Sequence, residues 1–499
     1  MNKTITMKKL FFLTIIIAFL VTNQKSAAQE LKKLTLDDVI KLAEEQSPNA
    51  LMAKHRFRAS YWQYRTFKAM YRPALTLTGN TPDYTTANTR VWDAVKGEYV
   101  YISTNILQNI GSLSLQQNIG FTGGTISLQS DLTLENNLET DKHNYITAPL
   151  SVRFVQPLFR YNSLRWEKKI SPLEYEQAKK TYVQSIESVH QQAVQYFFAL
   201  ALAQINKQIS EMNYDNADTL WKMSQGRYNL GTIAEDEMLE MQLSWLNTDN
   251  ARKEANMNLR DREIRLRSFL GFNENVNIEL IIPSEVPELQ VNPQEVLELA
   301  HANNPEMIAQ QLTLLNAQSS VAQAKAEKGL NANLVASFGL RDQDPVFANA
   351  YSKSNQQQTV RLGITLPILD WGQGRGRYQM AKSSLELAQV TSQQQRSDFD
   401  ANLILDCEQF NLQAGQVATA AKSDTVAQRM FQVAYERFRI GKISVLELNN
   451  ADTKKDSNRR AYIQAMQNYW NYFYNIRSLA LYDFINRKPL ETDYEKVLE

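Results

Sequence analysis

Apolar residues alternate with polar or small ones in short stretches of the chain. In one of them, Val360, Leu362 and Ile364 are each separated by a polar residue or glycine. Such a period of two predicts β-strands, and the strand stretches are 72–79, 150–157, 331–339 and 360–367. We expect 150–157 to pair with 72–79. One apolar and one polar face is typical of a strand between lipid and a wet lumen, but it also fits a soluble sheet packed on one face.

Between these strands the pattern is helical. The segment 36–71 opens with Thr35 and Asp38, which predict a capping box, and proline at position 48 interrupts the helix. The stretches from about 172 to 226 and from about 376 to 436 predict helices of about 85–90 Å, at ~1.5 Å per residue. Returning helices are predicted over 233–270 and 444–485. Because their faces are rich in Gln, Asn, Ser and Ala, these helices favour long antiparallel pairs around a wet interior.

The chain contains an internal duplication. RYNLGTI at 227–233 and RFRIGKI at 437–443 share their pattern of residue types and lie 210 residues apart. The shared positions are Arg227, Gly231 and Ile233 in the first copy and Arg437, Gly441 and Ile443 in the second. Pro157 and Pro367 each precede the loop glycine by 74 residues. Each glycine therefore predicts the reversal of a long helical hairpin, where a residue without Cβ turns most easily.

The two halves also begin alike, but at a different spacing. The openings 36–50 and 293–307 are offset by 257 rather than 210 residues, so the first half carries 47 extra residues within 80–150. The part 111–135 alternates on both sides of a glycine-rich turn and predicts a hairpin. It either joins the sheet, giving six strands per chain and 18 in a trimer, or projects as a long loop. We favour the loop.

These boundaries divide the chain into tandem units. The expected parts are a signal peptide (1–28), a first repeat (29–280), a linker (281–290), a second repeat (291–485) and a polar tail (486–499). Two repeats give four strands with open edges, and even eight strands only just close a barrel. The chain is therefore expected to close its sheet by forming an oligomer. Aromatic residues at the strand exits fit an interfacial girdle or an ordinary strand–helix junction: Phe159, Tyr161, Trp166 and Trp371.

Composition narrows the class of protein. A positive n-region, the apolar run 10–21 and the small residues 26–28 predict a secretory signal peptide. No later run of 18 or more apolar residues predicts a membrane helix. A net charge of +1 argues against nucleic-acid binding, and a single cysteine, Cys407, excludes an intrachain disulfide. The four histidines lack the spacing of metal ligands, and no nucleophile–base pair or cofactor motif is apparent. We expect neither an enzyme nor a metal or cofactor site.

Taken together, these motifs resemble the TolC family of outer-membrane channels over roughly residues 34–485. The resemblance rests on the opening LTLDDVIKLAEEQSPNA with its echo at 293–307, and on the strand exits QPLF (156–159) and LPIL (366–369). It implies a mainly α fold with a small β part, built from tandem helix–strand–strand–helix repeats. As a homotrimer, such chains form a β-barrel in outer-membrane lipid that continues as a long α-helical barrel in the periplasm.

The resemblance also implies a role and partners. Such channels are passive exit ducts of tripartite efflux or type I secretion systems, opened by a periplasmic adaptor (membrane fusion) protein. Energy comes from an inner-membrane pump of RND, ABC or MFS type. The turns around Arg227 and Arg437 would dock the adaptor, and Glu447 would fall on an acidic ring that narrows the closed aperture. Asn450 stands where the family has a second acid, which puts a double ring in doubt.

One other class of protein fits part of the pattern. A structural or adhesive coiled-coil protein of the cell envelope would share the signal peptide and the long helices. It would need an unbroken heptad pattern and would lack paired alternating strands. The strands at equivalent positions of both repeats favour the duct.

Overall fold

The structure, a computed structural model, describes residues 31–272, 277–352, 355–440 and 442–498. The signal peptide predicted for 1–28 and the turn residue Gly441 lie outside these ranges. The chain forms two compact units. The helical unit contains the residues up to 53, 184–296 and 403–490, and the sheet unit contains 54–183, 297–402 and 491–499.

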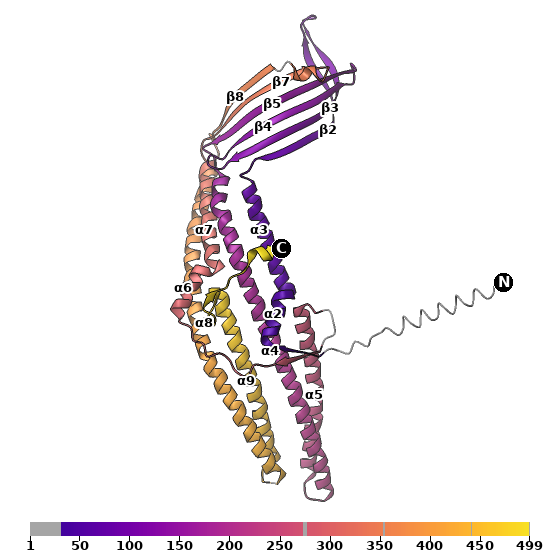
Figure 1. Ribbon diagram of the computed structural model, residues 1–499, viewed down its shortest axis with the longest axis vertical. Coiled ribbons are helices and arrows are strands. Elements are labelled where there is room, and N and C mark those ends of the chain that lie inside the picture. Colours follow the sequence, from indigo (N-terminus) through magenta and orange to yellow (C-terminus); the bar gives the residue numbers. More distant parts are fainter. Residues whose placement is uncertain (1–30, 273–276, 353–354, 441, 499) are drawn as a thin grey trace, which may run out of the picture. The chain divides into compact units, whose positions relative to one another are not determined.

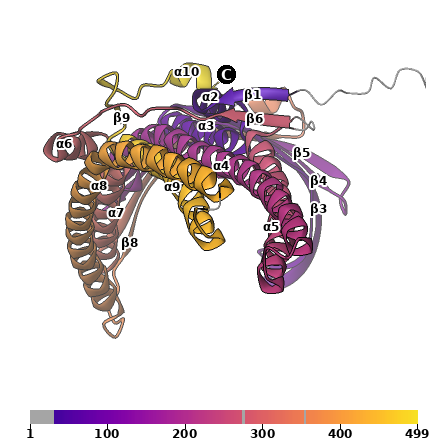
Figure 2. The same ribbon diagram turned by 90° about the horizontal axis from the view of Figure 1, so that it is seen from below.

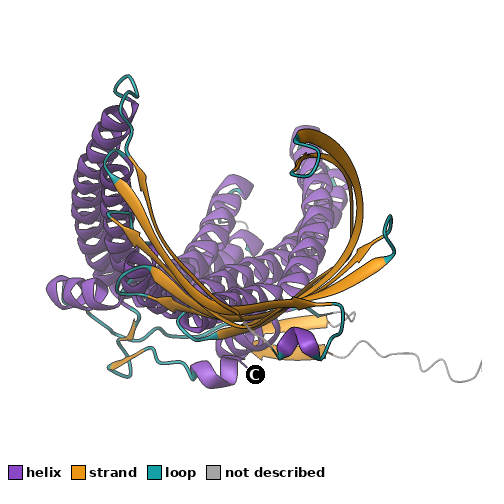
Figure 3. Cartoon of the chain, turned by 90° about the horizontal axis from the view of Figure 1, so that it is seen from above, coloured by secondary structure: helices purple, strands orange, loops and turns teal. Residues whose placement is uncertain are grey.

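The sheet unit is built on one curled antiparallel sheet of six strands (Figures 1 and 3). Its order is β2-β3-β4-β5-β7-β8, so β2 and β8 form its two edges. The strands are β2 (Ala74–Asp93), β3 (Glu98–Ile119), β4 (Gly124–Asn137), β5 (Lys142–Leu158), β7 (Asn331–Asp344) and β8 (Asn355–Thr365). Figure 3 shows these strands following an open arc.

The two faces of the sheet differ in polarity because side chains alternate along each strand and align across it. One row of cross-strand neighbours runs Leu75, Leu115, Leu128, Val152 and Phe338, and ends at Gln358 of β8. The adjacent row, on the opposite face, runs Thr76, Ser114, Gln129, Ser151, Gly339 and Gln357. The predicted alternation is therefore confirmed, and the apolar row is exposed in the single chain: Leu75 is 67% accessible.

Two expectations about the strands are wrong. The residues 111–135 do not project as a loop, because β3 and β4 pair with each other over Ile106–Ile119 and insert into the sheet. As a result 72–79 pairs with β3 and not with 150–157, which lies in β5 between β4 and β7. The extra residues alternate in the same phase as their neighbours, so their backbone groups are satisfied by two further ladders.

Helices complete the sheet unit. It holds most of α3 (Pro48–Ala69), the beginnings of α4 (Ser163–Asn229) and α8 (Gln373–Arg439), and α7 (Pro305–Glu327). The short helix α6 (Pro293–Asn303) precedes α7, and the 3₁₀ turn η1 (Asn349–Tyr351) lies between β7 and β8. The end of the predicted polar tail is helical: α10 (Tyr494–Leu498) places Tyr494 against Phe57 of α3, with ring centroids 5.4 Å apart.

The helical unit consists of two long hairpins and several shorter elements (Figure 2). The hairpins pair α4 with α5 (Glu235–Leu270) and α8 with α9 (Val445–Ala480). The shorter elements are β1 (Leu31–Thr35), α2 (Leu36–Gln46), β6 (Asn277–Ile281), β9 (Tyr482–Asp483) and β10 (Lys488–Pro489). At 67 residues each, α4 and α8 are longer than predicted, and α4 continues through Pro172. In the described part of the chain, no helix is long and apolar enough to cross a membrane.

Aromatic and aliphatic side chains hold the helical unit together. Phe197 and Phe198 of α4 are fully buried, and the side chains of Phe410 of α8 and Tyr469 of α9 are at most about one per cent accessible. The rings of Phe410 and Tyr469 lie 5.5 Å apart, and the Tyr469 hydroxyl donates to the carbonyl of Pro287 at 2.7 Å. Each such side chain contributes about 1.5–3 kcal/mol of burial free energy. This core fixes the roots of both hairpins.

Candidate functional site

The first hairpin reverses through a turn that depends on Gly231. The N–H of Thr232 donates to the carbonyl of Arg227 at 2.9 Å, and the N–H of Gly231 donates to the carbonyl of Tyr228 at 2.8 Å. Gly231 has φ +71°, the left-handed conformation that favours glycine. These are the two hydrogen bonds of a Schellman motif, which satisfies the last carbonyls of a helix.

The second hairpin repeats this geometry in its described residues. The N–H of Lys442 donates to the carbonyl of Arg437 at 2.9 Å, as Thr232 does to Arg227. Both turns therefore use the backbone of the arginine and not its side chain. Arg227 and Arg437 have exposed side chains, and neither forms an ion pair among the described residues. Their guanidinium groups are free to bind a partner.

Two grooves lie at the tips of the hairpins. A groove of about 390 Å³ is lined by both hairpins, including Arg227, Ile233 and Ile443. A second groove, of about 580 Å³, follows α8 and α9 and is lined by Arg437, Ile443, Glu447 and Asn450, among others. The structure thus brings the residues predicted from the two turns onto shared surfaces.

Glu447 also has a local structural role. Its carboxylate accepts from the backbone N–H of Ser444 at 3.0 Å, while the Ser444 hydroxyl accepts from the N–H of Glu447 at 3.3 Å. This is a capping box at the start of α9, and the signature Ser-x-x-Glu in SVLE (444–447) predicts it. The equivalent helix α5 has Ala234 at its N-cap, without a side-chain cap, and carries Glu235, Asp236 and Glu237 in its first turn.

The prolines predicted at the strand-to-helix junctions lie at the ends of strands β5 and β8. Pro157 lies inside β5 opposite Asn333, and Pro367 follows the end of β8. Phe159 and Trp371 both have left-handed backbones, with φ +61° and +51°, and are 71% and 91% accessible. Such conformations are strained for bulky residues and persist only where the surroundings enforce them.

The other two predicted aromatics differ from this pair. The hydroxyl of Tyr161 hydrogen-bonds to that of Ser319 in α7 at 2.5 Å, and the ammonium of Lys169 lies 5.1 Å from the ring of Trp166. Both side chains are only partly accessible. Tyr161 therefore packs at the strand–helix junction, whereas Phe159 and Trp371 project from it.

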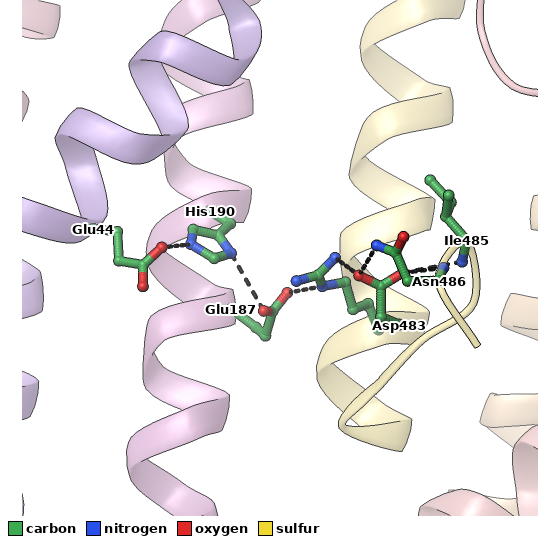
Figure 4. Close-up of polar contacts among 7 residues, drawn as sticks. Glu44, Glu187, His190, Asp483, Ile485 and Asn486 are labelled. Atoms are coloured by element: carbon green, nitrogen blue, oxygen red, sulfur yellow. Dashed lines mark hydrogen bonds and ion pairs between the residues drawn. The ribbon is translucent and has the colours of Figure 1, made fainter. Parts of the chain in front are cut away.

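A buried ionic cluster lies at the root of the hairpins (Figure 4). The ring of His190 lies between two carboxylates, with Nε2 3.3 Å from Glu44 and Nδ1 3.3 Å from Glu187. Arg477 joins Glu187 at 2.9 Å to Asp483 at 3.0 Å. The side chains of Glu187, His190 and Asp483 are less than a tenth accessible. The cluster therefore ties α2, α4, α9 and β9 together.

Burial and the neighbouring carboxylates have opposite effects on the protonation of His190. Burial disfavours the imidazolium of His190, but hydrogen bonds and charge from Glu187 and Glu44 outweigh it and raise the pKa to about 9. The hydrogen bond to His190 correspondingly lowers the pKa of Glu44. His190 is therefore protonated at neutral pH, which gives Glu187 and Glu44 a cationic partner. Only the pair Glu187 and His190, one turn apart on α4, signals the cluster in the sequence.

The tandem hairpins and the curled amphipathic sheet define the class of protein as an outer-membrane channel. Residues 39–272 and 296–480 match the family described as outer membrane efflux protein, and the chain belongs to that family. This confirms the resemblance to TolC channels, and the chain accordingly serves as an exit duct for efflux. The family is one of channels and not of enzymes.

Solved structures share this fold at low sequence identity. The CmeC outer membrane channel of Campylobacter jejuni is 14% identical, with a TM-score of 0.67, 93% of this chain covered and 88% of that one. VceC of Vibrio cholerae is 13% identical, with a TM-score of 0.61 and coverage of 91% and 97%. The outer-membrane channel OprN is 16% identical, with a TM-score of 0.63 and coverage of 89% of each chain. A comparison with curated protein sequences returns no match.

Proposed function

We propose that three copies of this chain form the exit duct of a tripartite efflux or type I secretion system in the outer membrane, extending into the periplasm. The observation that carries the proposal is the six-stranded sheet, whose apolar face is exposed and whose edge strands β2 and β8 pair with no other strand among the described residues. Three copies joined edge to edge would give the 18 strands of a closed sheet. Edge strands that remain unpaired promote aggregation.

The apolar face of the sheet has the dimensions of a membrane band. From Tyr145 to Leu158, β5 rises about 43 Å along the strand, or about 30 Å at a tilt of 45°. Phe159 and Trp371 lie exposed beyond one end of the band. Tyr145 packs edge-on against Phe347 at the other, with ring centroids 5.4 Å apart. Aromatic side chains at both ends fit the two interfacial girdles of a membrane sheet.

The helical unit offers a matching surface for a neighbouring copy. On α8, exposed apolar residues recur at intervals of seven: Leu405, Leu412, Val426, Val433 and Ile440, with Thr419 completing the series. On α5, Leu239, Leu243, Leu246, Met257 and Ile264 are also exposed. A strict seven-residue repeat is the pattern of helices that pack side by side. We assign α8 of one copy to α5 of the next, which closes a ring under three-fold symmetry.

The oligomer is tested by substituting the stripe on α8. Val433→Lys places a charge in the proposed interface and should lower the yield of trimer, measured by native mass spectrometry of the purified protein. Gln432→Lys, on the same turn but outside the stripe, is the matched control and should leave the trimer intact. A wild-type chain that purifies as a soluble periplasmic monomer would instead favour the structural or adhesive alternative.

The tips are proposed to receive the adaptor. Arg227 and Arg437 present guanidinium groups that the turns do not use, beside grooves containing Ile233 and Ile443. A charge reversal, Arg437→Glu, should abolish export while trimer yield is unchanged. Loss of the trimer would make the side chain structural. A photoreactive residue at position 437 should capture the adaptor and so identify the associated pump, of RND, ABC or MFS type.

Glu447 is proposed to narrow the entrance as a ring of three carboxylates, with Asn450 in place of a second acid. Rings of acids favour cations. Because Glu447 also caps α9, the test must separate charge from capping. Glu447→Gln retains the capping box and removes the charge, whereas Glu447→Ala removes both. The gate predicts the same gain in ion conductance for both variants in planar bilayers, and a change with Ala alone would assign the effect to the cap.

A further inference from the structure

The β2–β3 hairpin extends beyond the rest of the sheet. Strand β3 pairs with β4 only from Ile106 onward, whereas β2 and β3 pair with each other up to Asp93 and Glu98. Residues 85–105 therefore form a free two-stranded ribbon, drawn at the top of Figure 1. At ~3.4 Å per residue, its strands run about 30 Å past Tyr84.

The two faces of this free ribbon carry different chemistry. In the register of the hairpin, Arg90 lies opposite Tyr101 and Trp92 opposite Tyr99. The same face continues with Asn88, Ser103, Thr86 and Asn105. The acids Asp93 and Glu98 form a pair on the other face, together with Val91, Val100 and Ile102. Among the ribbon's described strand residues, Arg90 is thus the one charge on the aromatic face.

The aromatic face is exposed and ordered by its own contacts. Tyr101 is 74% accessible, and Trp92 and Tyr99 are more than half accessible. The rings of Trp92 and Tyr99 meet edge-on at 4.9 Å, and the guanidinium of Arg90 lies 4.2 Å from the ring of Tyr99. Arg90 forms no ion pair among the described residues. The face therefore presents flat apolar rings beside a cation whose N–H donors remain available.

This face continues the apolar face of the sheet. Leu113 and Leu115 lie on the same side of β3 as Tyr101, an even number of residues away. On the proposed duct, where the apolar face meets lipid, the free ribbon extends past the outer girdle, alongside the headgroups of the outer leaflet. That position, the exposed rings and the single cation together favour one occupant. Sugar rings have apolar C–H faces that pack on aromatic rings and hydroxyls that bond to amide and hydroxyl side chains, and a phosphate pairs with arginine.

The geometry points to a binding surface for the phosphorylated saccharide headgroup of an outer-leaflet glycolipid, formed by Arg90, Trp92, Tyr99 and Tyr101. The inference rests on the proposed outer-membrane duct for its position. The rings pack against the sugar faces, and Arg90 binds a phosphate. Such a surface anchors the projecting ribbon to the lipid surface around the channel.

The test measures binding of a delipidated, phosphorylated core oligosaccharide to the purified full-length protein by isothermal titration calorimetry. Trp92→Ala and Tyr101→Ala should each weaken binding about three- to tenfold, as expected for loss of one ring. Arg90→Gln should weaken binding of the phosphorylated oligosaccharide and leave binding of the dephosphorylated one unchanged. Val91→Ala and Ile102→Ala, on the opposite face, are matched controls and should bind like the wild type.

Two results would overturn the inference: no binding of the oligosaccharide by the wild type, or equal binding by the wild type and the Trp92 and Tyr101 variants. Tighter binding to phosphatidylglycerol vesicles than to glycolipid vesicles would also overturn it, because the contact would then be a general lipid one. Membrane fractionation tests the proposed duct separately. A chain that is absent from the outer-membrane fraction yet binds the saccharide would support the binding site and contradict the duct.

Discussion

The helical unit should become less stable as the pH rises, because His190 then loses its proton. Its pKa is raised from 6.5 to about 9 by Glu187 and Glu44 against the opposing effect of burial. The difference corresponds to about 3 kcal/mol of favourable interaction with the protonated ring. Because the folded-state pKa lies above the unfolded one, this stabilisation is fully present below about pH 6.5 and is lost as the pH rises through about 9.

The perturbation is His190→Gln, which removes the titrating ring but keeps a polar side chain beside Glu187. We expect the variant to unfold at a lower temperature than the wild type at about pH 6, and the gap to close at about pH 9.5. The assay is thermal loss of helical circular dichroism in detergent at both pH values. His55→Gln, at an exposed position of α3, is the matched control and should show no gap at either pH. If His190→Gln lowers the unfolding temperature equally at both pH values, protonated His190 is not the source of the stabilisation.

Further predictions concern the turn, the buried thiol and the sheet. Gly231→Ala should destabilise the first tip by about 1–2 kcal/mol, because its φ of +71° is unfavourable for a Cβ although no atom lies near one. Gly226→Ala, in the helix with the same open surroundings, should not destabilise, and hydrogen exchange of the tip amides compares the two. Burial raises the pKa of Cys407 to about 11, so maleimide should label it only on unfolding. Because Cys407 then contributes little background labelling, a cysteine introduced at Leu128 should react with lipid-soluble reagents and one introduced at Gln129 with water-soluble ones. The reverse pattern would contradict the assignment of the two faces of the sheet.

The hairpins were predictable from local sequence because their signals are local. Arg227 to Ile233 and Arg437 to Ile443 repeat one pattern, and Gly231 of the first copy adopts the left-handed conformation that ends a helix. The capping box of Thr35 and Asp38 forms as predicted, with the carboxylate 3.0 Å from the N–H of Thr35. Both long helices extend beyond their predicted bounds, and α4 continues through Pro172, which a long helix held by packing tolerates.

The partners of strands and charges were harder to predict. Alternation in 111–135 identified the strands but not their neighbours, since pairing depends on contacts far apart in the sequence. The cluster around His190 joins Glu44 to Asp483, residues that share no local pattern. The role of Glu447 was predicted from resemblance alone, although the local Ser-x-x-Glu signature also indicated a helix cap.

The unpaired edges of the sheet have a consequence for biogenesis. Strand β2 offers an edge of 20 residues and β8 one of 11, and in the proposed trimer each pairs with another copy. A newly exported chain therefore carries two reactive ends, and its fate is a competition between ordered ring closure and open-ended polymerisation. Ring closure requires two encounters between chains before the last edge can close, so its rate depends steeply on the local concentration of chains. A holdase that covers either edge would lengthen the interval available for correct assembly.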